Sequence, residues 1–199
     1  IWIGTQYQGL SVWMEESQLL KNYRADDFDD FAISDDEVTS IFQDSSGVVW
    51  IGTYNGGLNQ FNYLTNQFRL YQHKPNSTSG LQMPRVFAIE EDQEGNVWVG
   101  MDQGGINKVS HKYDSRGTIV NVNFQQGPGA IAANSIWSIE ADAKGLLWLG
   151  SIEEGLFCYN PVNDKLNNFQ KDSTKQTKGQ LSDNSIYALF FDSKSRLWI

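Results

Sequence analysis

Side chains suited to nucleophilic or metal chemistry are scarce in this chain: two histidines, His73 and His111, and one cysteine, Cys158. A zinc site needs several imidazole, thiolate or carboxylate ligands at close spacing, and neither histidine has a second His or a Cys beside it. The sequence also lacks the G-x-S-x-G and H-E-x-x-H patterns of hydrolases and metalloproteases. We therefore expect no catalytic site, no metal and no cofactor, and we expect Cys158 to pack as a small apolar residue.

Carboxylates gather in one stretch, residues 24–37, which we call the acidic linker; its acidic members are Asp26, Asp27, Asp29, Asp30, Asp35, Asp36 and Glu37. Clustered carboxylates can bind Ca²⁺, but the spacing of a calcium-binding loop is absent. A solvated acidic loop is the preferred interpretation, and calcium binding is the alternative. Two phenylalanines lie among the acids, and we expect Phe28 and Phe31 to anchor the loop to the body of the protein.

Charge and hydropathy exclude two classes of partner. The 199 residues carry a formal net charge of −9, and a strongly acidic surface repels nucleic acid. No run of about 18 apolar residues is present, so no part of this sequence is expected to span a bilayer.

An internal sequence repeat indicates which secondary-structure elements position these residues. Its clearest copy is V-T-S-I-F-Q-D-S-S-G-V-V-W-I-G-T-Y-N-G-G-L-N-Q-F at residues 38–61, and it returns at 86–109, from 136 and from 186. The tryptophans at one phase of the repeat, Trp2, Trp50, Trp98, Trp148 and Trp198, are 48, 48, 50 and 50 residues apart. A period of this length is typical of repeat architectures, so the chain is expected to be one array and an excerpt from a longer one.

Each unit predicts four short antiparallel strands and no long helix. In residues 38–71 the expected strands are 38–44, 48–53, 58–61 and 68–71, separated by turns rich in Asp, Asn and Gly. Four-stranded units of this length are the blades of a β-propeller, so the fold class is all-β. We expect a partial blade at 1–23, blades at about 38–71, 86–124 and 136–169, and a partial blade at 186–199.

The residues shared by the copies have structural uses. Trp50 and its equivalents should fill the space between blades, and Gly52, Gly100 and Gly150 should allow close approach of a neighbouring strand. The turn aspartates at the same phase, Asp44, Asp92, Asp142 and Asp192, should fix the first turn of each unit.

These motifs resemble the two-component regulator propeller repeat, whose pattern includes D-x-x-G-x-[LV]-W-[IVL]-G-[TS]. The pattern recurs at 38–58, 86–106, 134–156 and 184–199, essentially the whole chain. The departures are small: residues 82–85 replace the usual Asn, Met101 replaces Thr, and Ser195 replaces the turn Gly.

The resemblance implies a periplasmic, non-catalytic sensor domain of a bacterial transmembrane receptor, whose output module is a histidine kinase, often hybrid, or a diguanylate cyclase. It also implies oligosaccharides or other small molecules as signals. A propeller scaffold for protein–protein interaction, without ligand sensing, is the alternative. Because an open array exposes strand edges, we expect the remainder of a larger propeller, or a second copy associated edge to edge, as a partner.

A ligand would most readily bind where the sequence varies between copies. The loop that enters the first strand and the turn between the second and third strands lie at one end of an antiparallel blade. This end, the variable-loop face, is predicted to carry the ligand-binding residues Tyr7, Gln8, Tyr54, Asn55, Asp102, Gln103, Glu153 and Glu154.

Overall fold

The computed structural model describes residues 1–74, 80–110, 118–122, 135–171 and 180–199, and within them it consists of strands, turns and loops without a helix. The all-β prediction is confirmed. The predicted third blade extends to Phe124, but its last two residues, like His111, lie outside the described part of the chain.

The described strands form five antiparallel sheets that follow the chain order. The first sheet contains β1 (Trp2–Gly4), β2 (Leu10–Met14) and β3 (Leu19–Tyr23). The second contains β4 (Val38–Gln43), β5 (Val49–Thr53), β6 (Leu58–Asn62) and β7 (Gln67–Tyr71). The third contains β8 (Val86–Glu91), β9 (Val97–Met101), β10 (Ile106–Ser110) and β11 (Thr118–Val122). The fourth contains β12 (Ile136–Ala141), β13 (Leu147–Ser151), β14 (Leu156–Asn160) and β15 (Lys165–Phe169), and the fifth contains β16 (Phe190–Phe191) and β17 (Leu197–Trp198).

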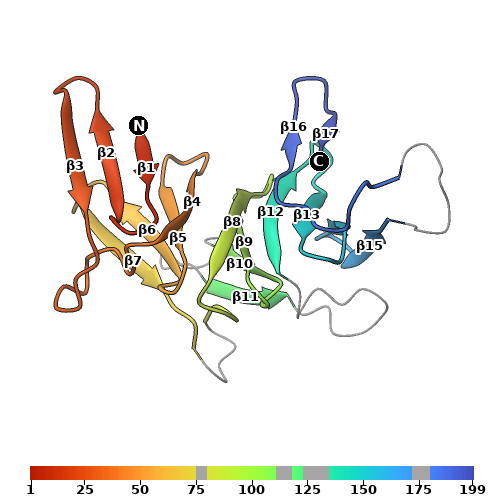
Figure 1. The fold of residues 1–199 in the computed structure, drawn as a ribbon, viewed down its shortest axis with the longest axis horizontal. Coiled ribbons are helices and arrows are strands. Elements are labelled where there is room, and N and C mark those ends of the chain that lie inside the picture. The colour runs from red at the N-terminus through yellow and green to blue at the C-terminus, as the bar shows by residue number, and fades with distance from the viewer. Residues whose placement is uncertain (75–79, 111–117, 123–134, 172–179) are drawn as a thin grey trace.

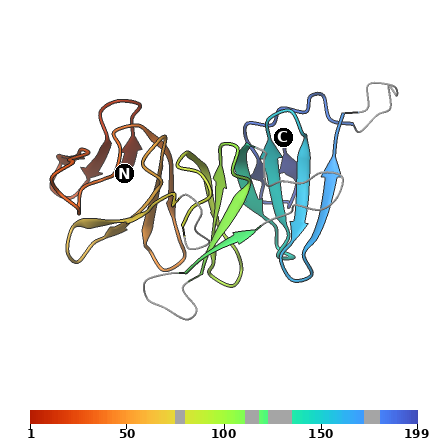
Figure 2. The same ribbon diagram turned by 90° about the horizontal axis from the view of Figure 1, so that it is seen from below.

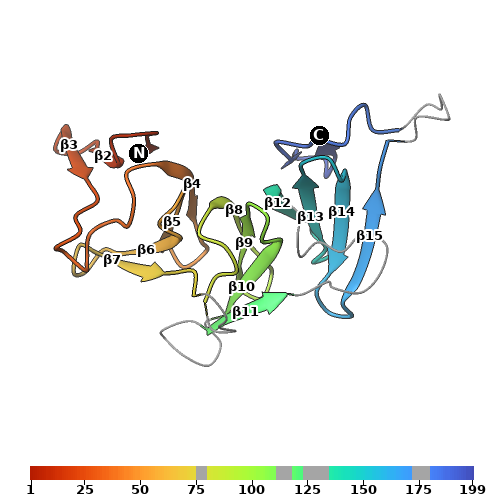
Figure 3. The same cartoon turned by 60° about the horizontal axis from the view of Figure 1, so that its bottom comes forward.

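The sheets succeed one another along an arc, from the N-terminal sheet at the left of Figure 1 to the C-terminal sheet at the right. The first strands β4, β8 and β12 lie toward the inside of the arc, and the last strands β7, β11 and β15 lie toward its outside (Figure 3). The view from below shows the same succession of sheets (Figure 2). Each of the three four-stranded sheets is therefore a propeller blade whose first strand is the innermost.

One aspartate holds the first turn of each blade, as predicted, and it also holds the blade's tryptophan. Asp44 Oδ1 accepts hydrogen bonds from the backbone N–H groups of Ser46 and Val48, at 3.0 and 2.9 Å. Its Oδ2 accepts a hydrogen bond from Trp50 Nε1 at 2.7 Å. The same Asp–Trp bond occurs in the other copies, at 2.7 Å for Asp92–Trp98, 3.2 Å for Asp142–Trp148 and 3.1 Å for Asp192–Trp198.

The hydrophobic core lies between blades. Trp50 is fully buried in a cluster with Val86, Val99 and Met101 of the following blade, and Trp98 is buried against Ile136 and Leu149 of the next. The predicted role of these tryptophans as inter-blade filling is therefore confirmed.

The repeated glycine makes this contact possible. A Cβ atom on Gly52 would lie 2.7 Å from Val86 Cγ1, and one on Gly100 would lie 2.8 Å from the carbonyl oxygen of Ile136. At Gly150 the nearest atom of the next blade is Ile186 Cγ2, at 2.7 Å. A side chain at these positions would push the neighbouring inner strand away, as the sequence predicted.

Two expectations were wrong. Phe28 is 100% exposed and Phe31 is 54% exposed, so neither ring anchors the acidic linker. The anchor is Ile33, which is 1% exposed and lies in the cluster between the first two blades. Phe31 contributes only its backbone carbonyl, which accepts a hydrogen bond from the Phe68 N–H at 2.9 Å.

In the partial blade predicted at 186–199, the first strand is also shorter than the inner strands of the other blades. Ile186 and Leu189 are buried as they would be in an inner strand, but regular pairing is confined to Phe190 and Phe191, opposite Trp198 and Leu197. The backbone N–H of Ile186 instead donates to Ser151 O in the preceding blade, at 2.8 Å.

Candidate functional site

The variable-loop face is assembled by backbone hydrogen bonds that join each blade's middle turn to the loop entering an inner strand. Tyr54 N donates to Glu37 O at 3.0 Å, and Asp102 N donates to Arg85 O at 3.0 Å. Ile152 N donates to Ser135 O at 3.1 Å in the fourth blade. The turns that carry the predicted residues therefore lie at the same end of their blades as the inter-blade loops, which the sequence argument required.

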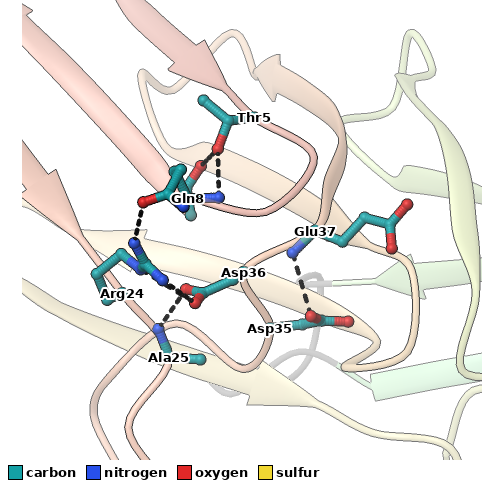
Figure 4. A network of polar contacts seen from close by, with 8 residues as sticks. Thr5, Gln8, Arg24, Ala25, Asp35, Asp36 and Glu37 are labelled. Carbon is teal, nitrogen blue, oxygen red and sulfur yellow. Dashed lines mark hydrogen bonds and ion pairs between the residues drawn. The ribbon is translucent and has the colours of Figure 1, made fainter.

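In the first blade one of the two predicted residues, Gln8, belongs to a polar network with the acidic linker (Figure 4). Tyr7 is exposed, and Gln8 Oε1 accepts a hydrogen bond from the Arg24 guanidinium. Arg24 also binds Asp36 Oδ2, through Nε at 3.0 Å and Nη2 at 2.7 Å, while Ala25 N donates to Asp36 Oδ1 at 2.8 Å. Burial opposes ionisation of Asp36, but these hydrogen bonds and the Arg24 charge together lower its pKa. At this corner of the variable-loop face, Arg24 and Asp36 therefore form an ordered ion pair.

In the second and third blades the structure brings Tyr54 and Asp102 together through one cation. The Arg85 guanidinium lies 4.5 Å from the centre of the Tyr54 ring, and its Nη1 is 3.0 Å from Asp102 Oδ2. Ser135 Oγ donates to Asp102 Oδ1 at 2.6 Å and accepts from Gln103 N at 3.1 Å. Arg85 was not predicted as a site residue, although it directly precedes the inner strand of its repeat.

The remaining predicted residues lie apart from this group. Asn55 is exposed, and its N–H donates to Asp35 Oδ2 at 2.8 Å. Glu153 has a positive φ of 71° and donates its N–H to Ser185 Oγ at 3.3 Å. Glu154 Oε2 accepts from Gln170 Nε2 at 2.9 Å, toward the outer strand. A binding role for any of the eight residues stays a prediction.

A row of aromatic rings at the inner edge of this face was not predicted from the sequence. We call this row the aromatic ladder: Tyr54, Phe87, Trp137 and Tyr187. Tyr54 meets Phe87 edge to face at 6.2 Å between ring centres, and Phe87 stacks on Trp137 at 4.5 Å with an interplanar angle of 25°. Trp137 meets Tyr187 edge to face at 5.3 Å. The row crosses four successive blades, and its last ring is 62% exposed.

A backbone irregularity orients the two central rings. The register between the first and second strands shifts between Val86 and Ala88, and again between Ile136 and Ser138, so that Phe87 and Trp137 are the extra residues of β-bulges. A bulge leaves its extra residue out of the ladder of paired residues and redirects its side chain. Thr39 occupies the same position in the second blade and donates through Oγ1 to Val86 O. Comparing the second residue of each inner strand (Thr, Phe, Trp, Tyr) could have found three of the four rings, but not Tyr54, which lies in a middle turn.

Two carboxylates lie farther along neighbouring inner strands. Burial, and after it the negative charge of Glu140, raise the pKa of Glu90 to about 7. Burial also raises the pKa of Glu140, against an opposing hydrogen bond from the Phe191 backbone. The inner surface of the third and fourth blades therefore holds a carboxyl group that titrates near neutral pH.

The two described residues of nucleophilic or metal-binding type, Cys158 and His73, have different environments. Burial and the charge of Asp142 raise the pKa of the Cys158 thiol, which makes it a poor nucleophile and confirms the prediction that it packs in the core. His73 Nδ1 lies 2.9 Å from Leu81 O, beside a parallel bridge between the same two residues, so this histidine closes the loop that joins two blades. Within the described residues no group of three or more His, Cys, Asp or Glu side chains is arranged to hold a metal ion.

The described part of this face offers aromatic ring surfaces, the paired guanidinium groups of Arg24 and Arg85, and several hydrogen-bonding groups. Such groups bind and orient a molecule through stacking and hydrogen bonds. The sheets define an array of β-propeller blades, and the variable-loop face lies at the end of the blades where the chain enters the inner strands.

Comparison with known proteins finds a family match within the repeats. Residues 32–55 and 80–103 match the family described as two component regulator propeller. These matches fall on the second and third copies of the repeat, the copies in which the resemblance predicted this family's pattern.

Two solved structures extend the likeness over nearly the whole chain. The extracellular domain of BT4673 of B. thetaiotaomicron, described as a hybrid two component system, is 25% identical with a TM-score of 0.79 over 99% of this chain and 24% of that chain. The extracellular domain of BT3049 of the same organism, described likewise, is 19% identical with a TM-score of 0.69 over 99% of this chain and 30% of that chain. The chain therefore spans about a quarter to a third of the length of these two structures.

The same fold also occurs in an enzyme. Virginiamycin B lyase of Staphylococcus aureus has a TM-score of 0.63 at 13% identity, over 95% of this chain and 55% of that chain. This likeness shows the fold alone. No curated protein sequence matches the chain. A search of the described residues finds no helix with the length and apolar character that a bilayer-spanning helix requires.

Proposed function

We propose that this chain is part of the periplasmic signal-input domain of a bacterial transmembrane receptor, that it has no catalytic activity of its own, and that it controls a histidine kinase or a diguanylate cyclase. The observation that carries the proposal is the combination of two matched regulator-propeller repeats with 25% identity to the BT4673 extracellular domain over 99% of the chain.

The variable-loop face is the proposed input surface. It combines turns of variable sequence with the aromatic ladder, whose rings are redirected by β-bulges in strands that the blade core holds rigidly. Signals of the proposed class are oligosaccharides or other small molecules, which such rings and hydrogen-bonding groups can hold. Ligand binding across several blades would change how they pack, and this change would pass through the membrane to the output domain.

The proposal is tested on the full-length protein in membrane vesicles. Autophosphorylation from ATP, or cyclic diguanylate formation from GTP, is measured with and without a panel of purified host and plant oligosaccharides. We expect at least one compound to change the output and to raise the midpoint of thermal unfolding of the protein.

The variants Trp137→Ala and Tyr187→Ala should abolish both responses, while Leu64→Ala, which alters a 96% exposed side chain in another turn, should leave them intact. A full-length protein with neither activity would refute the receptor assignment. A response that persists in both ladder variants would refute the ladder as the input surface.

A further inference from the structure

The acidic linker is a closed and ordered loop. Its ends are joined by the Arg24–Asp36 ion pair and by a parallel bridge between Ala25 and Ile33. Ile33 is buried between the first two blades, and the Phe31 carbonyl accepts the Phe68 N–H at 2.9 Å. The conformation of this loop is therefore fixed by the body of the protein.

The tip of the linker presents apolar side chains to solvent. Asp26 Oδ1 accepts the Phe28 N–H and Asp29 Oδ1 accepts the Phe31 N–H, both at 2.9 Å. Phe28 is nevertheless 100% exposed and Phe31 is 54% exposed. A fully exposed phenyl ring on a backbone that is already ordered can be buried by a partner at low entropic cost, which is the property of an interface anchor.

The surroundings of these rings specify the charge of the partner. A cavity of about 510 Å³ lies beside the tip, and its lining includes Asp26, Asp27, Asp29, Asp30, Asn55 and His73. In the described residues these carboxylates do not form a group that could hold a metal ion. Separated carboxylates around a cavity of side-chain size, next to an exposed ring, suit the guanidinium or ammonium group of another polypeptide.

We propose that the acidic linker is a docking element for a basic polypeptide partner. Phe28 enters an apolar depression of the partner, and an Arg or Lys side chain of the partner enters the cavity and pairs with Asp27 and Asp30. A second copy of this chain is disfavoured as the occupant because two chains of net charge −9 repel. The proposal concerns a surface separate from the aromatic ladder and does not rest on the receptor function.

The experiment measures binding to the full-length protein by isothermal titration calorimetry. The probe is a synthetic nonapeptide that alternates Leu and Arg, and its control is the same peptide with citrulline in place of each Arg. We expect the Arg peptide to bind at 50 mM salt and the citrulline peptide to bind at least 10-fold more weakly.

Phe28→Ser should weaken binding of the Arg peptide about 10-fold, whereas Leu64→Ser, at a comparably exposed position, should not weaken it. The double variant Asp27→Asn/Asp30→Asn should weaken it about 10-fold and remove most of its salt dependence. The matched control Glu15→Gln/Glu16→Gln changes the net charge equally at two exposed carboxylates elsewhere and should bind as the unaltered protein does. Thermal unfolding midpoints of all four variants should be unchanged.

Several results would overturn the proposal. Equal weakening by the Asp and Glu double variants would show general charge attraction only. Equal affinity of Phe28→Ser and Leu64→Ser for the Arg peptide would show that Phe28 is not an anchor. Displacement of the peptide by 1 mM Ca²⁺ would indicate a metal site instead, and protection of Phe28 from hydroxyl-radical labelling in the peptide-free protein would show that the ring is already covered.

Discussion

Glu90→Gln is expected to stabilise the protein at alkaline pH and to have no effect at acid pH. The pKa of Glu90 is raised from 4.5 to about 7 in the folded protein because its carboxyl group is buried and lies near Glu140. The folded state therefore disfavours the ionised carboxylate. This cost is absent below pH 4.5, grows as the pH rises toward 7, and is constant above it.

The expected change in the free energy of unfolding follows from the same two pKa values of Glu90. A pKa raised from 4.5 to about 7 corresponds to ~3 kcal/mol of destabilisation when the group is ionised. Because the side chain is only partly buried, solvent screening reduces the expected effect to about 1–2 kcal/mol. The uncharged glutamine has nearly the same shape and removes this cost.

The assay is urea unfolding of the protein and its Glu90→Gln variant at pH 4 and pH 8. We expect equal free energies of unfolding at pH 4 and a gain of about 1–2 kcal/mol for the variant at pH 8. Glu140→Gln should give a smaller gain, and the double variant should gain less than the sum, because each substitution removes the same repulsion. A gain of equal size at both pH values, or none at pH 8, would refute the reasoning.

Three further substitutions test the framework. Asp92→Ala removes the acceptor of the Trp98 Nε1 hydrogen bond and of four hydrogen bonds from Glu94 and Asn96, and should lower the free energy of unfolding by about 3 kcal/mol. A loss below about 1 kcal/mol in chemical denaturation would contradict the importance of this turn. Gly52→Ala places a Cβ atom 2.7 Å from Val86 and should cost about 1–3 kcal/mol, a loss that Val86→Ala should partly restore in the double variant. Arg24→Met removes the ion pair that lowers the pKa of Asp36, so the carboxyl ¹³C titration of Asp36 in NMR should move to higher pH; an unchanged titration would show that the Ala25 N–H alone suffices.

The features shared by the copies could be predicted from the sequence, because the same residue types occupy the same positions in each copy of the repeat. The Asp44 turn, the positive φ of Gly47 and the close approach at Gly52 all follow from residue types at fixed positions. The hydrogen bond from Trp50 Nε1 to Asp44 was not predicted, although both residues were singled out, because it depends on the orientation of a ring across a turn.

The predictions that were wrong and the features that were not predicted depend on contacts between blades, or between a loop and the body of the protein. Phe28 was expected to be an anchor because it is apolar, but closure of the linker by the Arg24–Asp36 pair places Ile33 in the core and leaves Phe28 outside. The aromatic ladder joins residues 33 to 50 positions apart in sequence, and it exists only because β-bulges turn Phe87 and Trp137 out of their strands. No pattern within one repeat contains that information.

Contacts within a blade and contacts between blades are made by different residues of the repeat. This separation has a consequence for how such proteins evolve. The aspartate–tryptophan bond is made inside one blade, whereas the repeated glycine meets the same kind of β-branched residue of the next blade in copy after copy, as at Val86, Ile136 and Ile186. Any blade therefore presents a compatible surface to any other. Gene duplication or deletion in steps of one repeat can lengthen or shorten the array without redesigning a single contact, while the turns of the variable-loop face diverge independently. Propellers with different blade numbers and different turn sequences can arise from one ancestral repeat by this route.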